Sequence, residues 1–271
     1  MKKQRKYGSL SRLLAFVLSV TMLAGLCPQG VSFFGMSLTL PKVQAAQHTL
    51  SNPRIVKESS MDAGQKVTWD CVYFGSYPQT EVVESGSKEE NALKRMNRYY
   101  VTKYQSVSSN AFAAIENASY DANGDATVGG TKYRRMKAGD ATYHDAGGYS
   151  DHYNWKDTST YHYFKYQPIK WRVLNRNGND ALLLADVALD DQKYNTNGED
   201  VTWESSSMRS WLNGYGASVN QPKTDYSRKN FIDSAFTSTQ RNAIKTTNVV
   251  NNNNIYHRTA GGNNTSDKVF L

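Results

Sequence analysis

The feature that most constrains the fold is a pair of apolar segments joined by an Asn-Gly turn. Residues 161–174 are rich in aromatic and β-branched side chains, and residues 181–185 form an apolar run. Asn177-Gly178 lies between them, and Asn-Gly in this position is typical of a two-stranded hairpin. Residues 182–184 are consecutive leucines, so we expect the second strand to be covered on both faces, near the centre of a sheet.

A further strand is predicted upstream of the hairpin. Val67, Trp69, Cys71 and Tyr73 alternate along a segment of strand composition, which we expect to end at Pro78 because proline donates no backbone hydrogen bond. Cys71 is expected to be a small buried hydrophobe, since no base that would activate its thiol lies beside it in the sequence.

Two short helices are predicted from apolar spacing and capping residues. The first covers residues 111–115 and follows a serine cap at 108–109. The second covers residues 208–212, between the serines at 205–207 and the stop signal Asn213-Gly214.

A third helix is predicted after Phe236. Thr237 and Gln240 have the spacing of a capping box, in which each side chain binds the backbone N–H of the other residue. This start should place Ala243 and Ile244 on the buried side of the helix.

Together these elements predict an α+β fold, with a mixed or antiparallel sheet and a few short helices, in one globular domain over residues 67–271. Residues 46–66 are polar and aperiodic and should form a linker. Residues 85–97 should form a charged surface loop or the start of a helix, and the Asn-rich residues 248–254 a loop. Residues 267–271 should begin another strand, and because the sequence stops within it we expect a domain that is truncated at its C-terminus.

The N-terminal residues have the layout of an export signal. The first twelve residues carry five cations and no acid, and an apolar run follows over residues 13–26. A Pro-Gln-Gly sequence interrupts that run before it reaches the about 20 residues that span a membrane. We expect residues 1–45 to be a signal peptide and the mature chain to be secreted or held at the cell surface. An uncleaved anchor lengthened by residues 33–40 is the alternative, and it would be the chain's attachment to a membrane.

Most of the positive charge lies in that segment. The chain has 32 Lys and Arg against 24 Asp and Glu, but residues 1–45 hold six of the cations and no acid, which leaves 26 against 24. This balance removes the main argument for nucleic-acid binding. Cys27 follows a leucine where a lipoprotein signal requires a small residue, so we expect no lipid attachment.

Seven short blocks of the sequence follow one another in an order that is recognisable from a known family. They are VYFGSYPQ at 72–79, PIKWRVL at 168–174, ALLLAD at 181–186, TWE at 202–204, MRSWLN at 208–213, AFT at 235–237 and DKVFL at 267–271. In this order, from about residue 70 to the end, they resemble the bacterial extracellular family called domain of unknown function 6273. The resemblance implies an exported protein of a Gram-positive bacterium and a family pattern that continues beyond residue 271. The layout also resembles, more weakly, C-type-lectin-like modules, which implies a fold but no particular activity.

The densest group of potential ligand-binding side chains lies in the aromatic segment 143–163. The residues expected to contact a ligand are Tyr149, Asp151, His152, Tyr153 and Trp155. Aromatic rings beside Asp, Asn and His side chains can stack on a sugar and bind its hydroxyl groups. The alternatives are an aromatic loop packed on its own sheet and a metal site. The metal site would use His144, Asp145, His152 and His162. Their spacing matches no compact metal motif, so we expect no metal or cofactor.

One segment has part of the pattern of a calcium loop. Asp121, Asn123 and Asp125 alternate as calcium ligands do. However, Ala126 replaces the glycine of the turn and Lys132 replaces the final acid, so a polar turn is predicted instead.

Another set is expected to be structural. It consists of Trp171, Trp203, Trp211 and Arg209. These residues lie within the predicted strand and helix patterns and should belong to the core. Arg209 is expected to pair with Glu204 or Asp186.

These patterns predict a non-catalytic extracellular binding or surface-interaction module. Its expected partner is an extracellular glycan or a surface protein, and not a nucleic acid. The alternatives are a hydrolase that uses the His and Asp residues of 143–163, and a structural spacer in a larger surface protein.

Overall fold

The computed structural model describes residues 49–96, 103–137, 159–253 and 259–271. Within these ranges, Ser51–Leu271 belongs to one compact unit, and no helix there has the length and apolar character needed to cross a membrane. The expected signal peptide, residues 1–45, lies outside these ranges and stays a prediction.

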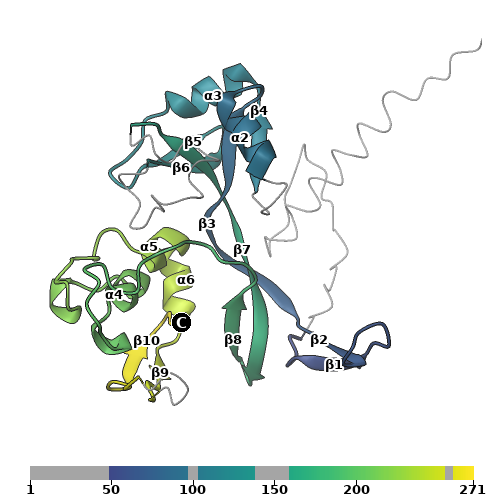
Figure 1. Ribbon diagram of the computed structural model, residues 1–271, viewed down its shortest axis with the longest axis vertical. Helices are drawn as coiled ribbons and strands as arrows, with labels where there is room; N and C mark the ends of the chain where they lie inside the picture. The colour runs from purple at the N-terminus through teal and green to yellow at the C-terminus, as the bar shows by residue number, and fades with distance from the viewer. Residues whose placement is uncertain (1–48, 97–102, 138–158, 254–258) are drawn as a thin grey trace, which may run out of the picture. The chain divides into compact units, whose positions relative to one another are not determined.

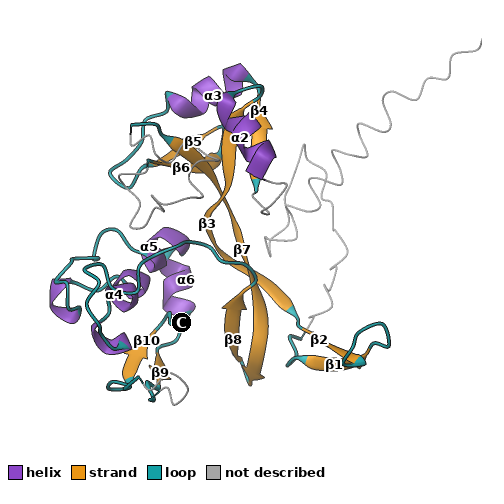
Figure 2. Ribbon diagram, in the orientation of Figure 1, coloured by secondary structure: helices purple, strands orange, loops and turns teal. Residues whose placement is uncertain are grey.

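The secondary structure of the described ranges is a mixture of strands and short helices (Figures 1 and 2). The strands are β1 (Arg54–Lys57), β2 (Gln65–Thr68), β3 (Cys71–Glu84), β4 (Tyr104–Val107), β5 (Asp125–Val128), β6 (Thr131–Met136), β7 (His162–Asn177), β8 (Asp180–Ala185), β9 (Thr247–Val249) and β10 (Thr265–Asp267). The α-helices are α2 (Lys88–Met96), α3 (Ser109–Glu116), α4 (Ser207–Asn213), α5 (Phe231–Ala235) and α6 (Ser238–Ala243), and the 3-10 helices are η3 (Trp203–Ser205) and η4 (Ala217–Val219).

The main sheet has six strands in the order β4-β3-β7-β6-β5, with β8 paired to β7 as well. β3 and β4 are parallel, whereas the other neighbours are antiparallel. Figure 1 shows β3 and β7 side by side, with β5 and β6 beside one half of β7 and β8 beside the other. The predicted α+β fold with a mixed sheet is therefore confirmed.

Both long strands continue through a proline, which corrects the prediction that β3 ends at Pro78. The pairing of β3 with β7 shifts register between Tyr73 and Ser76, and again between Pro78 and Thr80. Pro78 therefore lies at the second shift, and Pro168 of β7 lies opposite Ser76 at the first. At such irregularities a missing N–H costs little, which explains why neither strand stops.

The predicted β7–β8 hairpin is confirmed, but the central position of β8 is wrong. The two turn residues are Gly178 and Asn179, because Asn177 already pairs with Asp180, which places the turn one residue later than predicted. Gly178 has the positive φ, 59°, that such a hairpin requires. Among the strands that the structure describes, β8 pairs with β7 alone. Leu182 and Leu184 are 44% and 51% exposed. Three consecutive leucines cannot all face one side of a pleated strand, so they alternate between the core and solvent.

The first two predicted helices are confirmed with their caps. Ser108 Oγ accepts the N–H of Ala111 at 3.4 Å at the start of α3. Ser206 Oγ accepts the N–H of Arg209 at 3.1 Å at the start of α4, and Gly214 ends that helix in the left-handed region.

The third predicted helix, α6, is confirmed, and its predicted buried side is confirmed in part. Thr237 and Gln240 form the expected capping box. Ala243 is exposed and Ile244 is only half-buried. Ile244 nevertheless packs against the main core cluster, as Phe236 before the helix does, so only Ala243 departs from the prediction.

The structure adds detail to the predictions for three other segments, and in residues 85–97 it confirms the helix. Residues 85–97 include a helix, α2, whose Glu90 N–H is capped by Ser87 Oγ at 3.0 Å. The expected linker contains the antiparallel β1–β2 hairpin. The Asn-rich loop begins only after Val249, because β9 pairs with β10.

The predicted strand over residues 267–271 is wrong, since β10 ends at Asp267. Asn213 Oδ1 accepts the N–H groups of both Lys268 and Val269 at 3.0 Å. These two donors are therefore bound to a side chain and cannot extend a ladder of strand hydrogen bonds.

The largest core cluster lies between one face of the β3–β7 pair and the α4–α6 segment. Its buried members are Tyr77, Ile169, Trp203, Leu212, Phe231, Ile232, Ala235 and Phe236. Trp171 stacks on Phe236 with ring centroids 6.2 Å apart, and its Nε1 donates to Phe74 O at 2.7 Å. Smaller clusters form around Leu93 of α2 and Ile115 of α3. Full burial of one such aliphatic side chain is worth about 2 kcal/mol.

Gly75 lies where the backbone of β3 approaches the core closely enough to exclude a side chain. Its φ is 73°, and a Cβ there would lie 2.5 Å from Phe236 Cε1 and 2.7 Å from Ala235 O. Gly75→Ala should therefore lower the free energy of unfolding by about 3 kcal/mol, from backbone strain and overpacking together. Urea denaturation measures this loss.

Gly178→Ala is the matched control. Its φ is also positive, but no described atom lies within 4 Å of the added Cβ. The control should lose about 1 kcal/mol from backbone strain alone. Equal losses in the two variants would contradict the close approach at Gly75.

Candidate functional site

The predicted ligand-binding residues lie outside the described ranges. These residues are Tyr149, Asp151, His152, Tyr153 and Trp155. His144 and Asp145 of the alternative metal set lie there too, whereas His162 lies in β7. Within the described part of the chain, no three His, Cys, Asp or Glu side chains are grouped to hold a metal ion.

His162 forms a buried pair with Glu81 of β3. Its Nδ1 lies 2.8 Å from Glu81 Oε1, and both side chains are buried. Burial raises the pKa of Glu81, and the hydrogen bond with His162 opposes that rise. A pocket of about 50 Å³ adjoins the pair. Ligand sites usually measure about 300–1,000 Å³, so the described walls of this pocket do not enclose a sugar.

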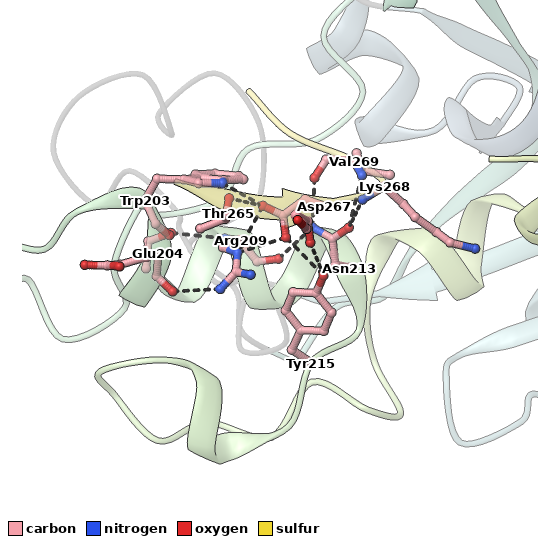
Figure 3. A network of polar contacts seen from close by, with 11 residues as sticks. Trp203, Glu204, Arg209, Asn213, Tyr215, Thr265, Asp267, Lys268 and Val269 are labelled. Carbon is pink, nitrogen blue, oxygen red and sulfur yellow. Dashed lines mark hydrogen bonds and ion pairs between the residues drawn. The ribbon is translucent and has the colours of Figure 1, made fainter. Parts of the chain in front are cut away.

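The second polar group surrounds Asp267 (Figure 3). The carboxylate of Asp267 is fully buried. It accepts hydrogen bonds from Trp203 Nε1 at 2.9 Å, from Tyr215 OH at 3.0 Å and from Thr265 Oγ1 at 2.5 Å. Arg209 Nε lies 2.9 and 3.0 Å from its two oxygens.

This geometry corrects the predicted partners of Arg209. Glu204 contributes only its backbone oxygen, which accepts from Arg209 Nη1 at 2.8 Å. Asp186 instead binds Arg172 and Lys170. The true partner, Asp267, is 58 residues away in sequence and was expected to begin a strand. With its lone pairs occupied by fixed donors, the Asp267 carboxylate has a structural role rather than a chemical one.

The tryptophans predicted to be structural all contribute to the core. Trp203 is buried, and Trp171 and Trp211 pack against the same cluster. Figure 3 shows Trp203 directed at Asp267 from the side opposite Tyr215. Its indole nitrogen is therefore used inside the fold and is not part of a binding platform.

The calcium-like segment is a polar turn, as predicted. Asp121 Oδ1 accepts the N–H groups of Asn123 and Asp125 at 2.8 and 2.9 Å. Asp125 is bound by Arg134 at 2.7 Å and by Lys132 at 2.8 Å. Lys132, which stands where a calcium loop has its last acidic ligand, therefore binds Asp125 with its own positive charge.

One face of the β3–β7–β8 segment carries side chains that point away from the core. We call it the open face. Its strand residues are Cys71, Tyr73, Lys170, Arg172, Leu182 and Leu184, and it includes Trp69 and Asp186, which contact Arg172. Cys71, Arg172 and Leu184 lie in one row across the three strands, and Tyr73 lies opposite Lys170 in the next.

Cys71 is exposed, which corrects the prediction that it is buried. The physical reason is its register, because residues directly opposite each other share a face. Cys71 is paired with Arg172, whereas the neighbouring Val72 is paired with the core residue Trp171.

The open face combines exposed rings with a small charged cluster. Tyr73 is 70% exposed, and the Arg172 guanidinium lies 5.2 Å from the centroid of the Trp69 ring. Arg172 and Lys170 bind Asp186 at 2.5 and 3.3 Å. Arg172 first, and then Lys170, lower the pKa of Asp186 below its usual value. Aromatic and hydrogen-bonding groups therefore lie together on one surface.

The comparisons with known proteins concern the later part of the chain. Residues 178–271 match the family described as Domain of unknown function (DUF6273). The chain contains a DUF6273-like domain. The matched range begins later than the resemblance from residue 70 predicts, and it includes β8, α4 and the whole Asp267 network. No curated protein and no solved structure matches, so the likeness to C-type-lectin-like modules is not confirmed.

The Asp267 network of the DUF6273-like domain leads to a stability prediction. Asp267→Asn keeps the shape of the side chain but leaves the partly buried Arg209 without its counter-charge. Breaking such a pair should cost about 3 kcal/mol. Asp180→Asn, which removes an exposed ion pair with Lys245, should cost less than about 1 kcal/mol. Thermal denaturation of both variants measures the difference, and similar losses would contradict the structural role.

The ion pairs of Asp125 should make the stability of the fold depend on pH. Burial raises the pKa of Asp125, but Arg134 and Lys132 outweigh that effect and the net shift is downward. A carboxyl group whose pKa is lower in the folded than in the unfolded chain stabilises the fold at pH values above the usual Asp pKa of about 4. This stabilisation is lost as the pH falls through the folded pKa. The melting temperature of Asp125→Asn should therefore lie well below that of the parent at pH 7, and the gap should narrow below about pH 4. A gap that is constant with pH would contradict the ion pair.

Proposed function

We propose that this chain is a non-catalytic, exported binding module whose ligand is an extracellular glycan. The observation that carries the proposal is the open face, where exposed rings lie beside charged groups on rigid strands. Aromatic rings supply flat apolar contact, and nearby polar groups fix the orientation of a ligand. A sugar has both the apolar ring face and the hydroxyl groups that such a surface binds.

The arrangement of the charges supports a neutral or weakly anionic glycan. Lys170 and Arg172 share one carboxylate, Asp186, so the cluster carries one net positive charge. Their side chains are about 40% exposed, and several donors therefore remain accessible to hydroxyl groups. A strongly polyanionic ligand would require more cations than this face provides.

The rigidity of the platform also supports binding. Tyr73 and Lys170 lie on opposite strands of the β3–β7 pair, whose other face carries the core residues Trp171 and Ile169. A surface on packed strands loses little conformational entropy when a ligand binds. The predicted aromatic segment 143–163 remains a second candidate contact region of the same module.

The hydrolase alternative gains no support from its described member. The His162 ring is buried and its Nδ1 is bound to Glu81. A general base must reach the proton that it removes from a substrate or water. The burial of His162 therefore favours a structural role for this residue.

Tyr73→Ala should weaken glycan binding about tenfold, because loss of one stacking ring costs on the order of 1.4 kcal/mol. Native affinity electrophoresis in gels that contain glycogen, xylan, mannan or hydroxyethylcellulose measures retardation by each polysaccharide. Tyr194→Ala, which removes another exposed tyrosine outside the open face, should leave the retardation unchanged.

Two results would contradict the proposal in different ways. Unchanged mobility of the parent chain in every gel would argue against glycan binding by this module. Retardation that is lost in Trp155→Ala but kept in Tyr73→Ala would move the binding site from the open face to the segment 143–163.

A further inference from the structure

We propose that β8 pairs with the β8 strand of a second copy of this chain, antiparallel and about a two-fold axis perpendicular to the sheet. In the resulting homodimer, the main sheets of the two copies would form one continuous sheet. This inference does not depend on glycan binding.

The hydrogen bonding of β8 defines which of its backbone groups point outward. Asp186 N donates to Lys170 O of β7 at 2.9 Å. Because backbone groups alternate in direction along a strand, those of Leu182 and Leu184 point toward β7. Those of Ala181, Leu183 and Ala185 point to the outer edge, where the described residues supply no further strand.

The side chains of β8 do not protect that edge. Exposed edge strands are usually blunted by lysine, proline, a bulge or short length. Residues 181–185 are all apolar and contain neither a charge nor a proline. By comparison, the edge strands β4 and β5 are only four residues long, whereas β8 has six residues. The outer edge of β8 is therefore the part of the sheet best suited to accept another strand.

The sequence of β8 favours its own copy as that strand. An isologous pair needs a segment that is complementary to itself. Centring the axis on Leu182 places the two Leu182 side chains together and sets Asp180 opposite Leu184. Centring it on Leu183 would instead set Asp180 opposite Asp186, and like charges directly opposite are unfavourable. Charge therefore selects the Leu182 register.

The backbone is also satisfied in this register. The outward groups of Ala181 and Leu183 meet those of Leu183 and Ala181 in the second copy. Leu182 and its equivalent then form a non-hydrogen-bonded pair with Cα atoms about 4.5 Å apart. Since the axis is perpendicular to the sheet, the open faces of both copies lie on the same side.

Sedimentation equilibrium of the full chain tests the dimer. The parent chain should show a concentration-dependent mass that reaches twice that of one chain. Leu182→Lys, at an exposed position, should weaken association at least tenfold without changing the circular dichroism spectrum. Thr127→Lys, on the exposed side of edge strand β5, is the matched control and should leave the dimer intact.

A disulfide trap tests the register. In a chain with Cys27 and Cys71 replaced by serine, Leu182→Cys should give an oxidised covalent dimer, because a Cα separation of about 4.5 Å suits a disulfide. Asp180→Cys should stay reduced, since the two copies of this residue would be about 13 Å apart along the strands. A monomer at all concentrations, a dimer that survives Leu182→Lys, or the absence of the Leu182→Cys dimer would overturn the proposal.

Discussion

The antiparallel pairing of β3 with β7 is the interaction on which the other elements depend. β4, β6 and β8 all bond to one of these two strands, and α2, α3 and α5 pack on β3. Two register shifts change the direction of the side chains along the pair. The same ladder thus contributes Tyr77 and Ile169 to one core cluster and Val82 and Tyr163 to another. A single continuous ladder can serve several clusters because its irregularities change which residues face inward.

Local sequence signals predicted local structure well. The hairpin turn at Gly178, the serine caps and the Thr237–Gln240 capping box each act within a few residues, and the structure contains all of them. Burial was harder to predict. Whether Cys71 or Leu184 is covered depends on which neighbour lies across the ladder and on what packs over it. Those facts are set by pairing over long sequence distances and are not contained in local composition.

The same distinction applies to the candidate sites. The polar turn at Asp121 was predictable because its competing cation, Lys132, lies nearby in the sequence. The partner of Arg209 was not, since Asp267 is brought to it only by the folded chain. The open face was missed because Cys71 was expected to be buried. Only the register of Cys71 with Arg172, and of Tyr73 with Lys170, reveals the exposed side.

The Asp267 network also joins segments that lie far apart in the sequence. Trp203 and Arg209 donate to Asp267, which lies about 60 residues further along the sequence. Asn213 accepts the N–H groups of Lys268 and Val269. Without residues 265–269, the partly buried Arg209 would have no counter-charge and Asn213 Oδ1 would lose both of its backbone donors. The α4 segment of the DUF6273-like domain therefore depends for its stability on a carboxylate that lies 58 positions further along the chain.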